Sequence, residues 1–547
     1  MGRIYSQADT TLAWLGKASQ DSNLAMDALE CLGKLTSDTS LESDASTESS
    51  ASVTSDTSCT CVSFIPWSDI PHKYVAKDMS EEPYNSTWVS LKSLFKRAYW
   101  SRAWTFQETV IPKWTLLMCG SASCELHYAL DAEHWLSYNG EGSCPMDIDP
   151  SVWACIKEAI RLDLGVLGSI RRAHFSFHAK AFGFDKDPYQ WRLLLESQGR
   201  EAKVAHDAIY AFLAVSRLPI KVDYLKSLNQ LFLDVARLGV EIEDLETVLY
   251  FATEVENSQP QPTAISWVPQ WSPPKKGCAA DFIAPFNYIY SANKGSLVSK
   301  AAFVNEVGQL TLFGKSCDIV RHIGPTSLPF HISDQLRDIL DHYKMLSPYA
   351  MHLPFLQAVI RTLMCDQNGQ HARLHATGSR NHEIFLKVII YAFIGIRKSK
   401  VEPTENVISS DKQLFGLPMD KHFGYFYAKE ILGDSSHKIT AKGHLEIMLP
   451  LLEALEQAKG VEDEFASYLS RLSYKTRFFF TSQGYLGTAP SCIEVGDKVI
   501  VSNHCRVPLL LRKCGLAYKF VGPCFVLGMM DGEAFQNNRD VEDLVVG

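Results

Sequence analysis

The C-terminal part of the sequence consists of short β-type runs separated by glycine, and this pattern limits what it can form. The runs are Arg477 to Ser482, Lys498 to Ser502, Pro508 to Arg512, Tyr518 to Val521 and Phe525 to Leu527. They are punctuated by Gly484, Gly487, Gly496 with Asp497, Gly515, Gly522 and Gly528. Runs this short and this closely spaced predict a small antiparallel β module, a sheet or a barrel, at residues 473–547.

The N-terminal residues have a different pattern, a strand followed at once by a helix. Thr10 to Leu15 is short, apolar and rich in β-formers, and Gly16 ends it. Asp21 or Ser22 can cap a helix. That helix would carry Leu24, Ala28, Cys31, Leu32 and Leu35 on one face. A strand joined to an amphipathic helix is half of a βαβ unit.

Between Thr36 and Thr60 the composition is dominated by Ser, Thr, Asp and Glu. A segment with so few large apolar residues cannot bury enough surface to offset the entropy lost on ordering. We therefore expect residues 36–60 to be a disordered insertion.

Further regular elements follow the insertion. Asn85 or Ser86 can cap a helix that bears Trp88 and Leu91. Ser101 can begin another, in which Trp104 and Glu108 stand one turn apart. Lys113 to Cys119 is strand-like, and so is Leu310 to Phe313. Apolar spacing predicts helices at Ala154 to Leu167, Tyr189 to Glu196, Asp207 to Val215, Leu228 to Leu238, and from Ser333 to about Leu472.

The predicted organisation is α+β overall. The Pro-rich stretch 258–277 contains Trp267 and Trp271, and it reads as a packed connector because two Trp side chains are costly to leave in water. The predicted parts are an α/β segment at 1–135, a helical region at 150–257, the connector at 258–277, a mostly helical region at 278–472 and the β module at 473–547.

Charge and cysteine usage exclude several classes of protein. Lys plus Arg is 53 and Asp plus Glu is 62, a net charge of -9, which argues against a generic nucleic-acid or anionic-membrane binder and leaves a local basic patch open. The fourteen Cys are scattered, which favours reduced, buried thiols in a cytosolic or nuclear protein. No stretch approaches the roughly 18 apolar residues that a membrane span needs.

Two candidate ligand sites have residue spacings that do not match the known motifs. Gly308 to Ser316 resembles a phosphate-binding loop, but five residues separate the glycines where the motif requires four. Cys119, Cys124, His127 and His134 fit no usual zinc pattern, so core thiols and surface imidazoles are favoured and no metal is expected.

The segment Arg102 to Glu108 is more distinctive. If it is helical, Trp104 and Glu108 share a face, and an aromatic wall beside a carboxylate can hold it against a sugar or ring substrate. The alternative is that Trp104 and Phe106 belong to the core and Glu108 makes local hydrogen bonds. Spacing alone favours this alternative.

Short blocks across the chain resemble the fungal heterokaryon-incompatibility (HET) domain family, in the order found in long HET proteins. The N-terminal blocks are Arg3 to Ala8, Leu12 to Gly16, Arg102 to Glu108 and Cys119–Gly120. The later blocks are Asp207 to Leu213, Asp223–Tyr224, Ser266 to Trp271, Leu310 to Gly314, Arg361 to Leu363, Gly484 to Gly487, Gly496–Asp497, Val507–Pro508 and Asp531 to Ala534. The motif residues carried by these blocks are Trp14, Gly16, Trp104, Gln107, Asp207, Tyr210, Trp267, Trp271, Gly484, Gly487, Gly496, Asp497, Gly532 and Glu533.

The resemblance implies a cytoplasmic protein of filamentous fungi with a role in non-self recognition and incompatibility cell death. It also implies a domain similar to the TIR fold, a flavodoxin-like parallel sheet. Many TIR domains cleave NAD with a Glu in a Trp-Cys-x-x-Glu stretch. Trp104 to Glu108 has the same interval with Thr105 in place of Cys, so Glu108 is the catalytic candidate by analogy.

The sequence departs from the family in two places. The family's first two strands have no counterpart before Arg3, which predicts an N-terminally truncated HET domain. Its Asp-Pro-Arg-Asp-Lys segment is here Val204 to Ala208, which retains only Asp207. Both departures predict a non-catalytic protein without a cofactor, NAD being conceivable only as a substrate.

Three functions remain open. The first is a regulator or effector of vegetative incompatibility that acts with an unidentified protein partner. The second is an accessory protein of a fungal specialised-metabolite gene cluster. The third is a TIR-like NAD glycohydrolase that uses Glu108.

Overall fold

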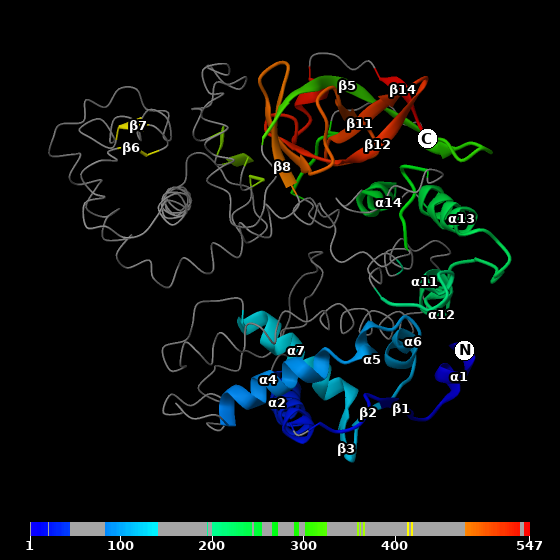
Figure 1. Ribbon diagram of the computed structural model, residues 1–547, viewed down its shortest axis with the longest axis vertical. Helices are drawn as coiled ribbons and strands as arrows, with labels where there is room; N and C mark the ends of the chain where they lie inside the picture. The colour runs from blue at the N-terminus through cyan, green and yellow to red at the C-terminus, as the bar shows by residue number, and fades with distance from the viewer. Residues whose placement is uncertain are drawn as a thin grey trace, which may run out of the picture. The chain divides into compact units, whose positions relative to one another are not determined.

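The computed structural model describes residues 2–19, 21–43, 83–140, 194, 200–242, 245–253, 265–271, 289–294, 301–324, 358–359, 361–362, 365–366, 413–414, 417–418, 476–536 and 541–547. The chain divides into an N-terminal unit, residues 1–225 with 271–276, and a C-terminal unit, residues 226–270 with 277–547. Figure 1 shows the helices and strands of both units. The mixture confirms the α+β class.

The N-terminal unit alternates helices with three short strands. Its elements are α1 (Gly2–Gln7), β1 (Thr11–Trp14), α2 (Ser22–Ser43), α4 (Pro83–Phe95), α5 (Ala98–Ser101), α6 (Thr105–Val110), β2 (Thr115–Cys119), β3 (Ala122–Glu125), α7 (Leu126–Gly140), α11 (Asp207–Tyr210) and α12 (Leu213–Ser216).

Strands β1, β2 and β3 form one sheet in that order. β1 runs parallel to β2, with Thr11 opposite Thr115 and Trp14 opposite Met118, as a strand–helix unit requires. β2 and β3 form an antiparallel hairpin with Cys119 opposite Ala122. The predicted strand at Thr10 to Leu15 and the end of the predicted strand at Cys119 are confirmed.

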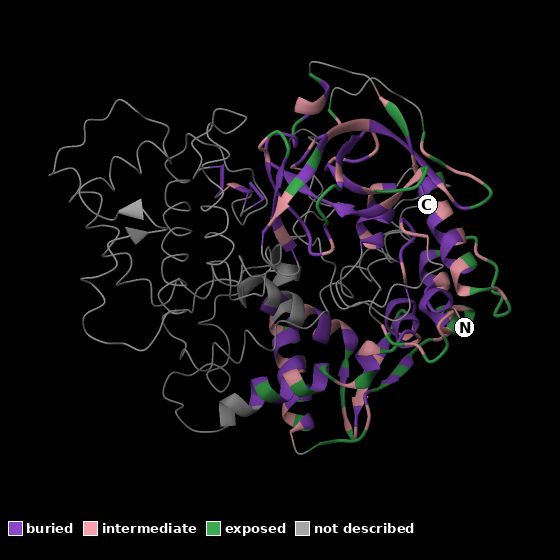
Figure 2. Cartoon of the chain, turned by 45° about the horizontal axis from the view of Figure 1, so that its top comes forward, coloured by how far each residue is buried: buried purple, intermediate pink, exposed green. Residues whose placement is uncertain are grey.

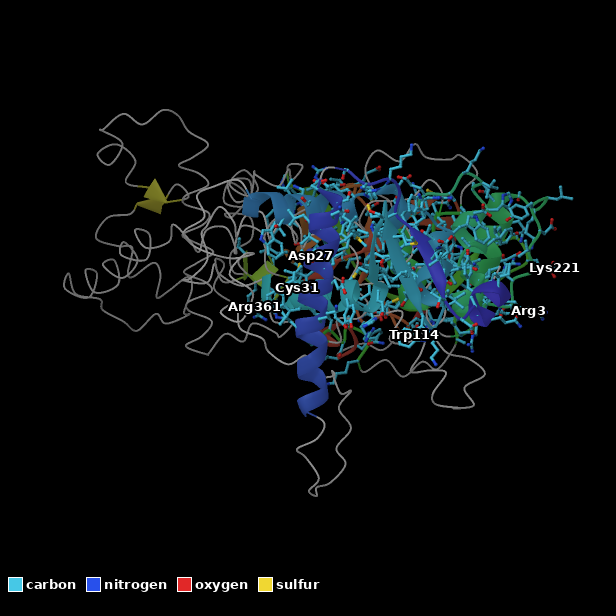
Figure 3. The ribbon with its side chains drawn as sticks, turned by 90° about the horizontal axis from the view of Figure 1, so that it is seen from below. Arg3, Asp27, Cys31, Trp114, Lys221 and Arg361 are labelled. Carbon is cyan, nitrogen blue, oxygen red and sulfur yellow. The ribbon has the colours of Figure 1, made fainter. Side chains whose placement is uncertain are left out.

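Helix α2 is longer than predicted. It begins at Ser22, as expected, but continues to Ser43, so the expectation of disorder from Thr36 is wrong for residues 36–43; residues 44–60 lie outside the described part. Figure 3 shows α2 extending well beyond Asp27 and Cys31. Gly33 lets α7 pack closely, since an added Cβ would lie 2.3 Å from the carbonyl oxygen of Tyr128.

The segment after α4 is not one helix. α4 begins at Pro83 rather than at Asn85 or Ser86, because proline is well suited to the first helical position. The helix expected from Ser101 is interrupted: α5 ends at Ser101, Arg102 is extended, and α6 begins at Thr105. The interruption is filled by Glu201, whose backbone bonds to Ser101 and Ala103.

The described residues of the C-terminal unit are mainly β. Its helices are α13 (Leu228–Glu241), α14 (Leu245–Ala252) and the short η4 (Glu533–Phe535). Its strands are β4 (Phe303–Val304), β5 (Leu310–Ile323), β6 (Gln413–Leu414), β7 (Leu417–Pro418), β8 (Thr476–Thr481), β9 (Leu486–Pro490), β10 (Lys498–Ser502), β11 (Leu509–Cys514), β12 (Ala517–Pro523), β13 (Phe525–Val526) and β14 (Glu542–Val546).

Five strands of this unit close on themselves. The order β10-β11-β12-β14-β5 is completed by direct pairing of β5 with β10, so the barrel has no open edge among these strands. β5 then continues past the barrel and pairs with β8, which leads to β9 and β13. In Figure 1 the green strand β5 crosses the orange and red C-terminal strands.

Most strands of this sheet lie within residues 473–547, the predicted β module, and β4 and β5 lie outside it. The five predicted runs all form strands, but β9 and β14 were not expected, and β12 pairs with β14 in parallel. The central strand β5 comes from residues 310–323, outside 473–547, and it is far longer than the predicted Leu310 to Phe313. Along its length β5 pairs with β14 at residues 310–314, with β10 at 314–319 and with β8 at 320–323.

The barrel core is apolar and closed to water. Its buried residues include Val320 of β5, Phe479 of β8, Val499 of β10, Leu510 of β11 and Val521 of β12, each at most 2% exposed. Figure 2 shows these strands mostly in the colour for buried residues. Side chains from strands far apart in sequence thus form one hydrophobic cluster.

The predicted helices of the middle region have mixed outcomes. Leu228 to Leu238 is confirmed as part of α13, whose Ser227 caps the backbone N–H of Gln230. Asp207 to Val215 is split into α11 and α12. The segments 154–167 and 333–357 lie outside the described residues, as do most of 189–196 and 367–472.

Candidate functional site

Glu108 lies on α6 and is half-buried. Its carboxylate accepts a hydrogen bond from the hydroxyl of Tyr5 on α1, at 3.2 Å between Tyr5 Oη and Glu108 Oε1. The local hydrogen bonds considered above for Glu108 do not include this contact. The partner is a residue 103 positions away in the chain, which no local pattern could identify.

A second tyrosine stands beside this carboxylate. Tyr99 on α5 is 7% exposed, and its hydroxyl makes no hydrogen bond of regular geometry among the described residues. Burial raises the pKa of Tyr99, and the negative charge of Glu108 raises it further. Burial and the same carboxylate raise the pKa of Tyr5 to about 12. Glu108 is thus held between two protonated phenols.

Trp104, the residue considered as an aromatic wall for Glu108, makes its hydrogen bond to another acid. It precedes α6, and its indole Nε1 donates to Asp207 Oδ2 at 3.0 Å. The other carboxylate oxygen of Asp207 accepts from Tyr224 Oη at 2.8 Å. Burial and this carboxylate raise the pKa of Tyr224 to about 12. Asp207, 8% exposed, therefore joins α11 to Trp104 and Tyr224.

Gln107 and Tyr210 are two other motif residues of these helices: Gln107 joins α6 to the end of α11, and Tyr210 joins α11 to the segment after α12. Gln107 is 2% exposed, and its side-chain nitrogen donates to the carbonyl oxygen of Ala211 at 2.5 Å. Tyr210 Oη donates to the carbonyl oxygen of Asp223 at 2.8 Å and accepts from its backbone N–H at 3.0 Å. These separate hydrogen bonds link α6 and α11 to each other and to neighbouring segments; the residues that make them are called the α6–α11 cluster, namely Tyr5, Trp104, Gln107, Glu108, Asp207, Tyr210 and Tyr224.

Tyr5 and Tyr224, which bond to the two acids of this cluster, predict how stability depends on pH. In the unfolded chain their phenols ionise near pH 10, whereas the folded chain keeps those of Tyr5 and Tyr224 protonated to about 12. The two phenols therefore make their full contribution to the free energy of unfolding below about pH 10. That contribution falls as the pH rises from there towards 12. We expect the double variant Tyr5→Phe, Tyr224→Phe to lose less stability over this interval, measured by urea unfolding at a series of pH values. Identical pH profiles for the two proteins would contradict the assignment.

Four other motif residues occupy positions that support the fold: Trp14, Gly16, Trp267 and Trp271. Trp14 is 53% exposed on β1, and Gly16 follows the strand at φ +110°, where its carbonyl oxygen accepts from the N–H of Gly120. Trp267 and Trp271 are both buried, which confirms that the tryptophans of the connector are packed. Trp267 Nε1 donates to the carbonyl oxygen of Gly308.

The motif glycines of the C-terminal unit lie at turns and close approaches. Gly484 is in the β8–β9 turn, and Gly496 is in the turn before β10. Gly487 is in β9, where a Cβ would lie 2.3 Å from the ring of Phe479. Gly532 precedes η4, and Glu533 accepts the backbone N–H of Asp531 through its carboxylate at 2.6 Å.

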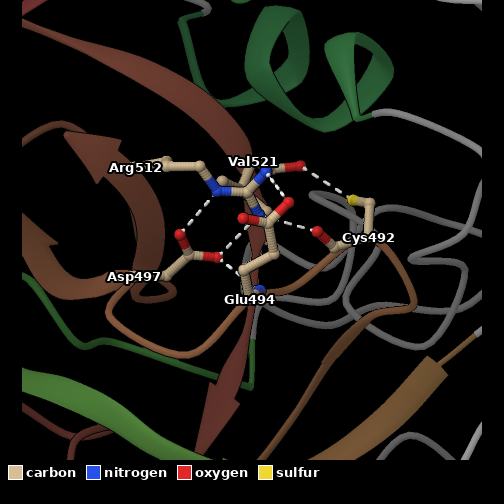
Figure 4. Close-up of polar contacts among 5 residues, drawn as sticks. All are labelled: Cys492, Glu494, Asp497, Arg512 and Val521. Atoms are coloured by element: carbon tan, nitrogen blue, oxygen red, sulfur yellow. Dashed lines mark hydrogen bonds and ion pairs between the residues drawn. The ribbon is translucent and has the colours of Figure 1, made fainter. Parts of the chain in front are cut away.

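Asp497 is the centre of a second polar cluster. Its carboxylate, 1% exposed, accepts two hydrogen bonds from Arg512, at 2.8 Å from Nε and 3.0 Å from Nη2. Arg512 also donates to the carboxylate of Glu494 and to the carbonyl oxygen of Cys492 (Figure 4). These residues, the Asp497–Arg512 cluster, join β11 to the loop before β10. Arg512 is not indicated by the sequence, because no local pattern distinguishes an arginine that lies inside a β run.

Metal ligands do not gather in the described part of the chain, where no group of three His, Cys, Asp or Glu could hold an ion. Cys119 and Cys124 are buried on neighbouring strands, and burial raises the pKa of the Cys124 thiol to about 12. The Gly308 to Ser316 segment runs into β5, where its amides pair in the sheet. No helix within the described ranges is long and apolar enough to cross a membrane.

Comparison with known proteins identifies two segments. Residues 1–108 match the family model described as Heterokaryon incompatibility protein (HET), and residues 350–546 match that of the Het-6 beta-barrel domain. No curated protein and no solved structure is significantly similar to the chain. The first match ends at Glu108, and the second contains the strands β8 to β14.

Proposed function

The chain belongs to the heterokaryon incompatibility (HET) family, and on this premise we propose that it is a non-catalytic regulator or effector of the cell-death response that follows non-self recognition in filamentous fungi. It would act in the cytoplasm through a protein partner. The presence of both a HET segment and a Het-6 barrel in one chain supports this role.

The proposal that the protein is non-catalytic rests on the hydrogen bonds of the two acids in the α6–α11 cluster. Glu108 accepts from Tyr5, and both oxygens of Asp207 accept from Trp104 and Tyr224. A catalytic carboxylate must reach the substrate within hydrogen-bond distance. These acids instead join α1, α6 and α11, which is a structural task.

A TIR-like fold is part of the proposal. The parallel pairing of β1 with β2, with α2 between them in sequence, supports it, because a flavodoxin-like sheet is built from parallel strands joined through helices. The antiparallel strand β3 departs from a purely parallel sheet. Mixed sheets of this kind are common among α/β folds.

We expect no release of nicotinamide from NAD by the purified chain, and none by Glu108→Gln. The substitution should instead lower the free energy of unfolding by about 1 kcal/mol, because the hydrogen bond from Tyr5 loses its charged acceptor. Nicotinamide release is followed by chromatography and stability by urea unfolding. Turnover that disappears in Glu108→Gln while stability is unchanged would contradict the proposal and favour a TIR-like NAD glycohydrolase.

The role in cell death is tested by deleting the gene in one of two strains whose fused hyphae die. The proposal predicts that the fused cells survive in this deletion strain. Reintroducing the intact chain should restore cell death, and reintroducing Glu108→Gln should restore it equally. A variant that lacks Arg477 to Gly547 should not restore it. Death that continues in the deletion strain would refute the role, and restoration that requires Glu108 would refute its non-catalytic nature.

A further inference from the structure

A small cavity lies beside the first turns of α13, within the C-terminal unit (Figure 1). Its volume is about 200 Å³, which suits one large side chain rather than a drug-sized ligand, whose pockets begin at about 300 Å³. Three segments line the cavity: the start of α13, the connector on either side of Trp267, and the turn between β4 and β5.

The apolar part of the lining is buried and held in place. Leu233 of α13 is 5% exposed and Val268 of the connector 3%. The β4–β5 turn packs on the lining, since a Cβ added to Gly308 would lie 2.7 Å from Ile265 Cδ1 and 3.0 Å from Leu233 Cδ2. Trp267 Nε1 also donates to the carbonyl oxygen of Gly308, at 3.0 Å. The cavity is therefore formed before a ligand enters, which lowers the entropic cost of binding.

The polar part of the lining offers hydrogen-bond acceptors. Gln230 Nε2 donates to Asp234 Oδ1 at 2.7 Å, and Gln270 Nε2 donates to the carbonyl oxygen of Val268 at 3.3 Å. Among the described residues, the side-chain oxygens of both glutamines have no hydrogen-bond partner. The exposed carboxylate of Glu306 likewise makes no hydrogen bond or ion pair within the described ranges. Unused oxygen acceptors, one of them charged, favour a ligand that carries N–H donors and positive charge.

The positive charges near the cavity do not neutralise this carboxylate. Lys226 forms an ion pair with an acid of α13 at 2.6 Å. Arg237 donates from Nη2 to the backbone carbonyl oxygens of Asn305 and Glu306, at 2.9 and 3.1 Å. The start of α13, which Ser227 caps, carries a partial positive charge that weakens the binding of a cation by about fivefold at most at an exposed site. A hydrogen bond to a charged group strengthens binding by more than about tenfold, so the carboxylate prevails.

We propose that this cavity binds an arginine side chain of the protein partner, an inference that rests on the proposed function because it names the chemistry of that partner. The methylene groups of the arginine would contact the apolar lining around Leu233 and Ile265. Its guanidinium group would donate to Glu306 and to the side-chain oxygens of the two glutamines. Arginine is favoured over lysine because its planar head has five N–H donors, and because protein interfaces are enriched in Arg and depleted in Lys.

The test is the binding of the peptide acetyl-Ala-Arg-Ala-amide to the full chain, followed by NMR of methyl groups labelled in Ile, Leu and Val. We expect saturable shifts of the methyl signals of Ile265 and Val307. A peptide with citrulline in place of arginine keeps the shape and loses the charge, so it should bind at least about tenfold more weakly. Glu306→Gln should weaken the binding of the arginine peptide by a similar factor, for the same reason.

Glu542→Gln is the matched control, because Glu542 is an exposed acid of β14 in the same unit and does not line the cavity. It should bind the arginine peptide as the unaltered chain does. Both variants should melt at the temperature of the unaltered chain, since the changed side chains are exposed.

Equal binding of the arginine and citrulline peptides would overturn the proposal, as would unchanged binding by Glu306→Gln. Absence of shifts at Ile265 and Val307 would overturn it too. These measurements do not involve cell death, so their failure is distinguishable from failure of the proposed function, which the gene deletion tests.

Discussion

Deletion of Arg477 to Gly547 is expected to abolish soluble, cooperative folding of the C-terminal unit rather than to trim it. β5 would lose β8, β10 and β14 together, since all three neighbours lie in the deleted part. Leu312, buried against β14, and Val320, buried in the barrel core, would then be open to water. An unpaired, apolar strand of this length is an aggregation site.

The measurement is the soluble yield of the fragment 1–476, followed by its thermal unfolding. Co-expression of residues 477–547 as a separate chain is the control, because it returns the missing neighbours of β5 and should recover soluble protein. A fragment 1–476 that is soluble alone and unfolds in one cooperative step that includes β5 would show that the C-terminal strands are dispensable.

Asp497→Ala is expected to lower the free energy of unfolding of the C-terminal unit by about 3 to 5 kcal/mol, since removing one partner of a buried ion pair leaves the other without compensation. Asp497 is 1% exposed and accepts two hydrogen bonds from Arg512 (Figure 4). The effect is measured by urea unfolding and by hydrogen exchange of the β10 and β11 amides.

Lys226→Ala is the matched control for that change. Lys226 and Asp234 form an ion pair of similar length, 2.6 Å, but their side chains are 31% and 26% exposed. Such a pair contributes only about 0 to 1 kcal/mol. Replacing both Asp497 and Arg512 by apolar residues should recover part of the loss, because no buried charge remains. Equal effects of Asp497→Ala and Lys226→Ala would contradict this account.

Elements with strong local signals could be predicted from the sequence. The strand around Leu12 and Ala13, the start of α2 at Ser22 and the helix from Leu228 are set by spacing and capping within a few residues. The short β runs between glycines are another such case. The end of α2 was missed because helix propagation can carry polar residues beyond the last apolar contact.

The candidate site could be predicted less well. Trp104, Glu108 and Asp207 were identified as motif residues, yet their partners were not. Trp104 and Asp207 are 103 positions apart, and so are Tyr5 and Glu108. The break at Arg102, which sets the direction of Trp104, depends on Glu201. Nothing in the spacing of residues 101–108 contains that information.

The sequence by itself determined the family, the α+β class and the positions of most C-terminal strands, because each of these depends on residues that are neighbours in the chain. Only the tertiary structure decided that β5 closes the barrel, that β14 pairs in parallel with β12, and that Arg512 bonds to Asp497. A strand pairs where it best covers a buried apolar face, and a buried charge pairs with the group that best compensates it. That choice compares segments far apart in the sequence, so no local pattern encodes it.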